Sequence, residues 1–160
     1  MEFLRKELKL CLCCMTEHDV ATVRVREKNI FMGEEIEYDA IYEYCAETDE
    51  YVASDEEISI NNISMKNAYR MKMGLLTSDE IENIRQKHEI SQLDFEIILD
   101  WECGAIAHYE SHKIQDKSHD KTLRMNNEKP GIYVSMLNKS KERLSLENYT
   151  KYLNVAEQLM

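Results

Sequence analysis

Alternating apolar and polar positions mark the first third of the chain. Val23 and Val25 belong to one alternating run, and Ile36 and Tyr38 belong to the next. A period of two is typical of β-strands that bury one face. Gly33 lies between the two runs in "MGEE", where a hairpin turn favours a residue in the left-handed region. The pattern therefore predicts a small antiparallel sheet.

A helical pattern follows the predicted sheet. Ile58, Met65 and Tyr69 recur at mixed three- and four-residue intervals, and Gly74 is a stop signal. This segment predicts a connecting helix. After Pro130, apolar residues again recur at helical spacing, which predicts one or two amphipathic helices that pack back or pair between chains.

Three short helices are predicted between these segments. Thr77 with Glu80 three residues later forms a capping box, and Ser91 begins a second helix. The third lies in "WECGAIAHYE", where Ile106 and Tyr109 are expected to point inward. Three short helices with brief connections suit a helix-turn-helix domain, although other small helical bundles share this spacing.

The predicted fold class is α+β. A small N-terminal antiparallel β domain covers 1–56, and a connecting helix covers 57–74. An all-α helix-turn-helix domain then covers 75–128, and a helical C-terminal tail covers 129–160. The order of strands followed by helices is the basis of this division.

Composition and charge narrow the class of protein. The 160 residues include only four glycines and one proline, which argues against a loop-rich or disordered chain. No signal peptide and no apolar run of membrane-spanning length is recognised, so a cytoplasmic protein is expected. The net charge of −11 argues against non-specific nucleic-acid binding. It suits either a solvated acidic surface or attraction to a basic protein partner.

The chain contains five cysteines, which are candidates for metal binding or disulfide formation. An odd number in a reducing compartment makes metal binding a better interpretation than a disulfide framework. The argument applies to the first four of the five cysteines: Cys11, Cys13, Cys14 and Cys45.

The chain resembles the MqsA (YgiT-type) antitoxins. The most specific motifs are "YRMKMGLLTSDEI" and "HYESHKIQDKSHD", which are similar to the family's "YRKKxGLLTPEEI" and "RYExGxIQDxAHD". The similarity runs from about Cys11 to Tyr149. It implies a zinc-ribbon-like β domain that binds a partner toxin or stabilises itself. It also implies an Xre-like helix-turn-helix domain that dimerises and binds operator DNA.

The resemblance implies a structural zinc site, with ligands Cys11, Cys14 and Cys45. The family's closing cysteine position is Thr48 here. The fourth ligand is therefore left open among four residues: His18, Asp49, Glu47 and Cys13. Of these, His18 and Asp49 are taken as the candidates. Buried thiols without a metal, and an open catalytic zinc, are the alternatives.

The predicted recognition helix lacks the side chains that usually contact DNA bases. The positions that face DNA in the family are occupied by Gly104, Ala105, Ala107 and His108, none of which makes a bidentate base contact. Gly104 is also expected to cost the helix about 1 kcal/mol relative to Ala. Three further residues are predicted to contact phosphate or an adjacent base: Gln92, Lys113 and Lys117. Weak, salt-sensitive DNA binding or none is expected.

Two functions follow, and neither is enzymatic, because no nucleophile–base pair or cofactor loop is recognised. The first is an MqsA-like antitoxin and transcriptional regulator that acts as a homodimer. The alternative is a phage or mobile-element inhibitor, for example anti-CRISPR-like, that keeps the fold but binds a protein through an acidic surface. That surface comprises the following acids of the predicted sheet: Glu34, Glu35, Glu37, Asp39 and Glu43.

Overall fold

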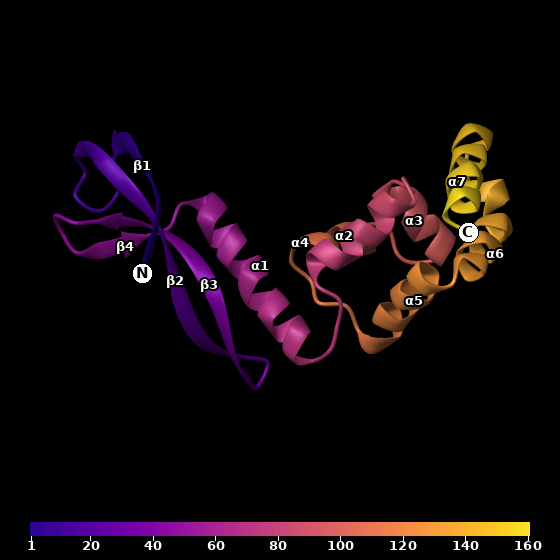
Figure 1. The fold of residues 1–160 in the computed structure, drawn as a ribbon, viewed down its shortest axis with the longest axis horizontal. Helices are drawn as coiled ribbons and strands as arrows, with labels where there is room; N and C mark the ends of the chain where they lie inside the picture. The colour runs from indigo at the N-terminus through magenta and orange to yellow at the C-terminus, as the bar shows by residue number, and fades with distance from the viewer. The chain divides into compact units, whose positions relative to one another are not determined.

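A computed structural model describes all 160 residues, which form two compact units, Met1–Met73 and Gly74–Met160. The first unit combines a four-stranded sheet with one helix, and the second is entirely helical (Figure 1). The predicted α+β class and the N-terminal antiparallel sheet are confirmed. No helix has the length and apolar character needed to cross a membrane.

The sheet is antiparallel with strands in sequence order. Its strands are β1 (Glu2–Leu10), β2 (Glu17–Phe31), β3 (Glu34–Cys45) and β4 (Glu50–Val52). The longest pairing joins β2 to β3 across a two-residue turn. Met32 and Gly33 in this turn have φ of 50° and 79°, which confirms the left-handed position predicted for the glycine.

The helix α1 (Asp55–Lys72) packs against β3. It begins at Ser54, whose hydroxyl accepts from the Glu57 amide while the Glu57 carboxylate accepts from the Ser54 amide. This reciprocal pair satisfies two backbone groups at the start of the helix. The apolar contact buries Ile36, Tyr38 and Ala40 of β3 beneath Met65, Ala68 and Tyr69 of α1.

The helical unit has one core. Its helices are α2 (Ser78–Lys87), α3 (Gln92–Leu99), α4 (Ala105–Ser111), α5 (Lys117–Glu128), α6 (Pro130–Lys139) and α7 (Leu146–Leu159), with a short 3-10 turn at Lys141–Arg143. The N-caps predicted at Thr77 and Ser91 are confirmed. Tyr133 and Leu137 of α6 and Tyr152 of α7 share the core with α2–α5. The C-terminal helices therefore pack back onto the unit.

One expectation about Gly104 is wrong. Gly104 does not lie within α4 but precedes it as the N-cap, with φ of 91°. L-residues rarely adopt this left-handed conformation, whereas glycine adopts it without steric cost. The predicted helix penalty therefore does not apply, and glycine favours this turn.

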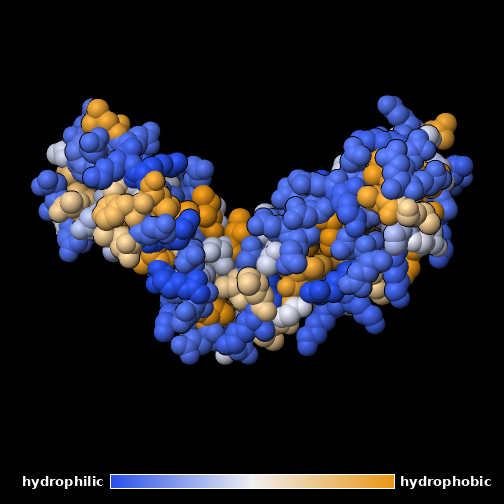
Figure 2. Space-filling model, in the orientation of Figure 1, coloured by the Kyte–Doolittle hydropathy of each residue, from blue (hydrophilic) through white to orange (hydrophobic).

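The surface drawn in Figure 2 is mainly hydrophilic, in keeping with the acidic composition. Large apolar side chains are nevertheless exposed on β1 and on the loop that follows it. Leu8 is 65% exposed and Met15 is 66% exposed.

Candidate functional site

A tight loop between β1 and β2 holds the first cysteine pair. The Cys11 amide donates to the Thr16 carbonyl over 2.9 Å, and the Met15 amide donates to the Cys11 carbonyl over 2.8 Å. Met15 adopts a left-handed conformation with φ of 58°. The loop therefore turns back on itself, which brings Cys14 to the same place as Cys11.

Four possible ligands converge at this loop. Cys45 enters from the end of β3, and His18 enters from the start of β2. The ligand atoms of Cys11, Cys14, His18 and Cys45 all lie within 4.8 Å of one another. Cys45 Sγ and His18 Nε2 are 3.8 Å apart, while Cys11 and Cys45 are buried. Three sulfurs and one imidazole nitrogen at these distances can bind a metal ion.

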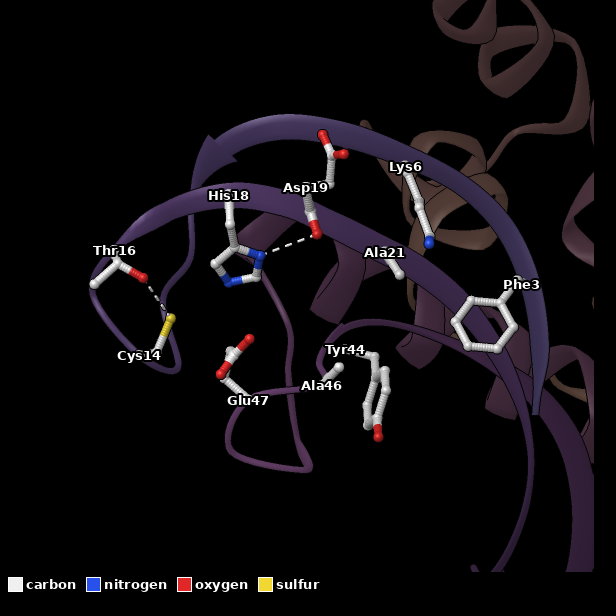
Figure 3. A pocket seen from close by; sticks show the side chains of 10 residues that line it. All are labelled: Phe3, Lys6, Cys14, Thr16, His18, Asp19, Ala21, Tyr44, Ala46 and Glu47. Atoms are coloured by element: carbon white, nitrogen blue, oxygen red, sulfur yellow. Dashed lines mark hydrogen bonds between the residues drawn. The ribbon is translucent and has the colours of Figure 1, made fainter.

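A hydrogen bond to the backbone of the next residue orients the His18 ring. Its Nδ1 lies 3.0 Å from the Asp19 carbonyl, so Nδ1–H donates there (Figure 3). This leaves Nε2 as the nitrogen that can bind a metal ion with the cysteines. That carbonyl, followed by the Cys11 and Cys14 thiols, raises the pKa of His18 to about 9. The Asp19 carbonyl and the neighbouring thiols therefore favour positive charge on the imidazole ring.

Thr48 hydrogen-bonds to Cys45, a contact that the sequence does not reveal. Hydrogen bonds from its hydroxyl and its amide lower the pKa of Cys45 to about 6. The thiolate form binds metal, so this favours the state of Cys45 that a ligand needs. Thr48 thus hydrogen-bonds to one of the candidate ligands and is not a candidate ligand itself.

The other proposed fourth ligands lie outside the cluster. The structure does not bring Asp49 to it, because the Asp49 carboxylate accepts from the Tyr44 hydroxyl over 2.6 Å. Cys13 Sγ faces the Glu50 carbonyl at 3.8 Å. Glu47 lines an open cavity of about 630 Å³ that has Cys14 and His18 on its wall (Figure 3). His18 is therefore the fourth member of the group.

A buried carboxylate fixes the start of α4. Glu96 of α3 is 3% exposed, and its carboxylate accepts from the amides of Gly104 and Ile106, each over 2.9 Å. Buried N–H groups at a helix start need such partners. The bond joins α3 to the beginning of α4, so the angle between these two helices is held by Glu96.

An ion pair fixes the other end of α4. Glu110 accepts from Arg85 of α2 over 2.7 Å and 3.2 Å, and the two side chains are only 6% and 16% exposed. Gln92 of α3 donates to the same carboxylate over 2.5 Å. Glu96 and Glu110 therefore both stabilise the fold of α4.

The predicted DNA-binding residues differ in exposure. Gln92 is half-buried and its amide is engaged with Glu110. Gly104, Ala105 and Ala107 are also half-buried, whereas His108, Lys113 and Lys117 are exposed. His108 lies over the turn, since a Cβ at Gly104 would be 3.6 Å from its ring.

The predicted acidic surface is largely neutralised within the sheet unit. Glu43 is buried and pairs with Lys9. Three other acids have basic partners within 3.2 Å, namely Glu34 with Lys72, Glu37 with Lys28, and Asp39 with Arg26. Glu35 is exposed. The five carboxylates therefore present less negative charge than their number suggests.

Comparison with protein-family models gives no match, and neither do comparisons with curated proteins and with solved structures. The molecule is therefore defined by its own geometry, as an α+β protein with a Cys₃His group able to bind a metal ion.

Proposed function

We propose that this chain is a zinc-containing, helix-turn-helix transcriptional regulator of the MqsA antitoxin type, which binds a partner protein and operator DNA as a homodimer. The observation that carries the proposal is the arrangement of α3 and α4. Glu96 ties the two helices together, and the Arg85–Glu110 pair ties α4 to α2. A helix-turn-helix needs a second helix held at a fixed angle in this way.

Zinc is the metal that suits the Cys₃His group. Zinc bonds to sulfur and imidazole nitrogen are about 2.3 Å and 2.0 Å, so in a tetrahedral site two sulfurs lie roughly 3.8 Å apart and a sulfur and a nitrogen roughly 3.5 Å apart. The 3.8 Å between Cys45 Sγ and His18 Nε2 is close to this sulfur–nitrogen separation. Four protein ligands would close the coordination sphere, which is typical of structural and not catalytic zinc. Bound zinc would join the β1–β2 loop to the end of β3.

The outer edge of α4 would contact DNA through few specific groups. Ile106 and Tyr109 are buried and Ala105 packs partly against the same core, which leaves Ala107 half-exposed and His108 exposed. Alanine contacts only apolar base edges such as the thymine methyl. Affinity would therefore come mainly from contacts to the phosphate backbone and would fall with salt.

The test is titration of the full chain with labelled DNA from its own upstream region, beside scrambled DNA, from low to physiological salt. We expect weak binding that prefers the upstream sequence. Lys117→Gln should lower affinity for both DNAs and reduce the salt slope by about 1. Lys151→Gln, which removes an exposed lysine of α7, is the matched control and should change neither.

Absence of binding at low salt would contradict the regulator and favour the second candidate, a protein-binding inhibitor with a retained helix-turn-helix fold. The observation that favours this candidate is the small, uncharged edge formed by Ala105 and Ala107 on α4.

A further inference from the structure

The two edges of the sheet differ in how far their backbone groups are covered. Beyond the short β4, the edge of β3 is covered by α1. The Asn61 side-chain amide accepts from the Ile41 N–H over 2.7 Å and donates to the Ile41 carbonyl over 2.9 Å. Ser64 donates to the Asp39 carbonyl over 2.8 Å. These bonds satisfy backbone groups that would otherwise be open to another strand.

No such cover protects β1. It is the outermost strand on the other side, nine residues long, and eight of them are exposed. Within the sheet, β1 pairs with β2 alone, so its outer edge has no strand partner. Phe3, Leu4 and Leu8 on this strand are 56%, 39% and 65% exposed. An exposed edge with apolar side chains is a template for another strand.

The charges of β1 complement those of an antiparallel second copy. A two-fold axis through Lys6 places Arg5 opposite Glu7 of the second copy, and Glu7 opposite its Arg5. Leu4 lies at the register shift between Phe3 and Arg5 and has no regular place in this pairing. The two charge pairs are favourable cross-strand contacts.

Other symmetric registers fit less well. An axis through Arg5 or through Glu7 sets like charges against each other, and neither provides the two opposite-charge pairs that the Lys6 axis provides. An axis through Leu8 would pair Glu7 with Lys9, but Lys9 already binds the buried Glu43 of its own chain. The register of β1 with β2 shifts between Phe3 and Arg5, and the strand is regular from Arg5 onward. The three central residues of the Lys6 register lie in this regular part.

We propose that β1 pairs antiparallel with β1 of a second copy of this chain, centred on Lys6, so that the two sheets become one. The two Lys6 side chains lie opposite each other and oppose the pairing. A single strand pair also buries less than the roughly 800 Å² per partner of a standard interface. The association is therefore weak and concentration-dependent. It does not depend on the proposed function, because neither DNA nor metal takes part.

The test is sedimentation equilibrium of the full chain over a wide concentration range, with reversed charges on β1. Arg5→Glu alone and Glu7→Arg alone each place two like-charge pairs across the axis. Each should weaken self-association by about tenfold or more. An equal mixture of the two variants restores both opposite-charge pairs and should associate like the wild-type chain. Glu35→Arg, on the exposed part of β3, is the matched charge control and should have no effect.

The mixture distinguishes this register from any other association. Recovery in the mixture, with weak association of each variant alone, supports the Lys6-centred pair. A wild-type chain that stays monomeric to millimolar concentration overturns it. Association that ignores both reversals, or a mixture no stronger than its components, also overturns it. Unchanged circular dichroism and metal content show that each variant is folded.

Discussion

Cys45→Ser is expected to remove the metal and unfold the sheet unit while the helical unit stays folded. The end of the sheet at the cysteine cluster has little core besides the ligands, because Cys11, Val20 and Cys45 are its buried residues. A bound metal stabilises the folded state by its binding free energy, here expected to be roughly 4 kcal/mol or more. A small unit has a low free energy of unfolding, so the loss of the metal's binding free energy should unfold it.

Hydrogen exchange measured peptide by peptide is the suitable readout, because it reports the two units separately. Protection should disappear from β1–β4 in Cys45→Ser and persist in α2–α7. Cys103→Ser is the matched control, since Cys103 is exposed and belongs to the helical unit. A chelator should reproduce the effect of Cys45→Ser on the wild-type chain. Equal protection in the two serine variants would show that Cys45 binds no stabilising metal.

Glu110→Ala is expected to destabilise the helical unit by about 3–5 kcal/mol, because it leaves the Arg85 guanidinium buried without its partner. The Gln92 amide loses its acceptor at the same time. Chemical denaturation followed by circular dichroism measures the change. Any DNA binding should weaken too, since α4 loses the contact that fixes its C-terminal end.

Glu102→Ala is the control for Glu110→Ala. It removes an exposed carboxylate next to the same helix and should change the free energy of unfolding by less than about 0.5 kcal/mol. Glu110→Gln keeps an acceptor oxygen for Arg85 and should recover part of the loss. A loss in Glu110→Ala as small as that of the control would mean that the pair is solvated.

Local features of the fold could be predicted from the sequence. The capping box of Thr77 and Glu80, the N-cap at Ser91 and the turn at Gly33 each depend on residues a few positions apart. The period-two pattern of β2 and β3 likewise reflects one buried face. These features depend on backbone chemistry that is largely independent of the tertiary fold.

Features set by long-range contacts could not be predicted. Arg85 and Glu110 are 25 positions apart, and no local pattern in the sequence links the two residues. The sequence pattern predicted that Gly104 lies inside a helix. In the structure α4 begins one residue later, and this start, which the local sequence does not determine, gives Gly104 its left-handed φ. The choice of His18 over Asp49 depends on how the β1–β2 and β3–β4 loops close, which spacing does not determine.

A Cys₃His zinc site in the sheet unit can be tested directly by metal analysis and X-ray absorption on the full chain purified without chelator. We predict one zinc per chain, bonded to three sulfurs at about 2.3 Å and to one imidazole nitrogen at about 2.0 Å. These ligands would be Cys11, Cys14, Cys45 and His18. A chain free of zinc, or a zinc whose fourth ligand is a carboxylate oxygen, would contradict the claim.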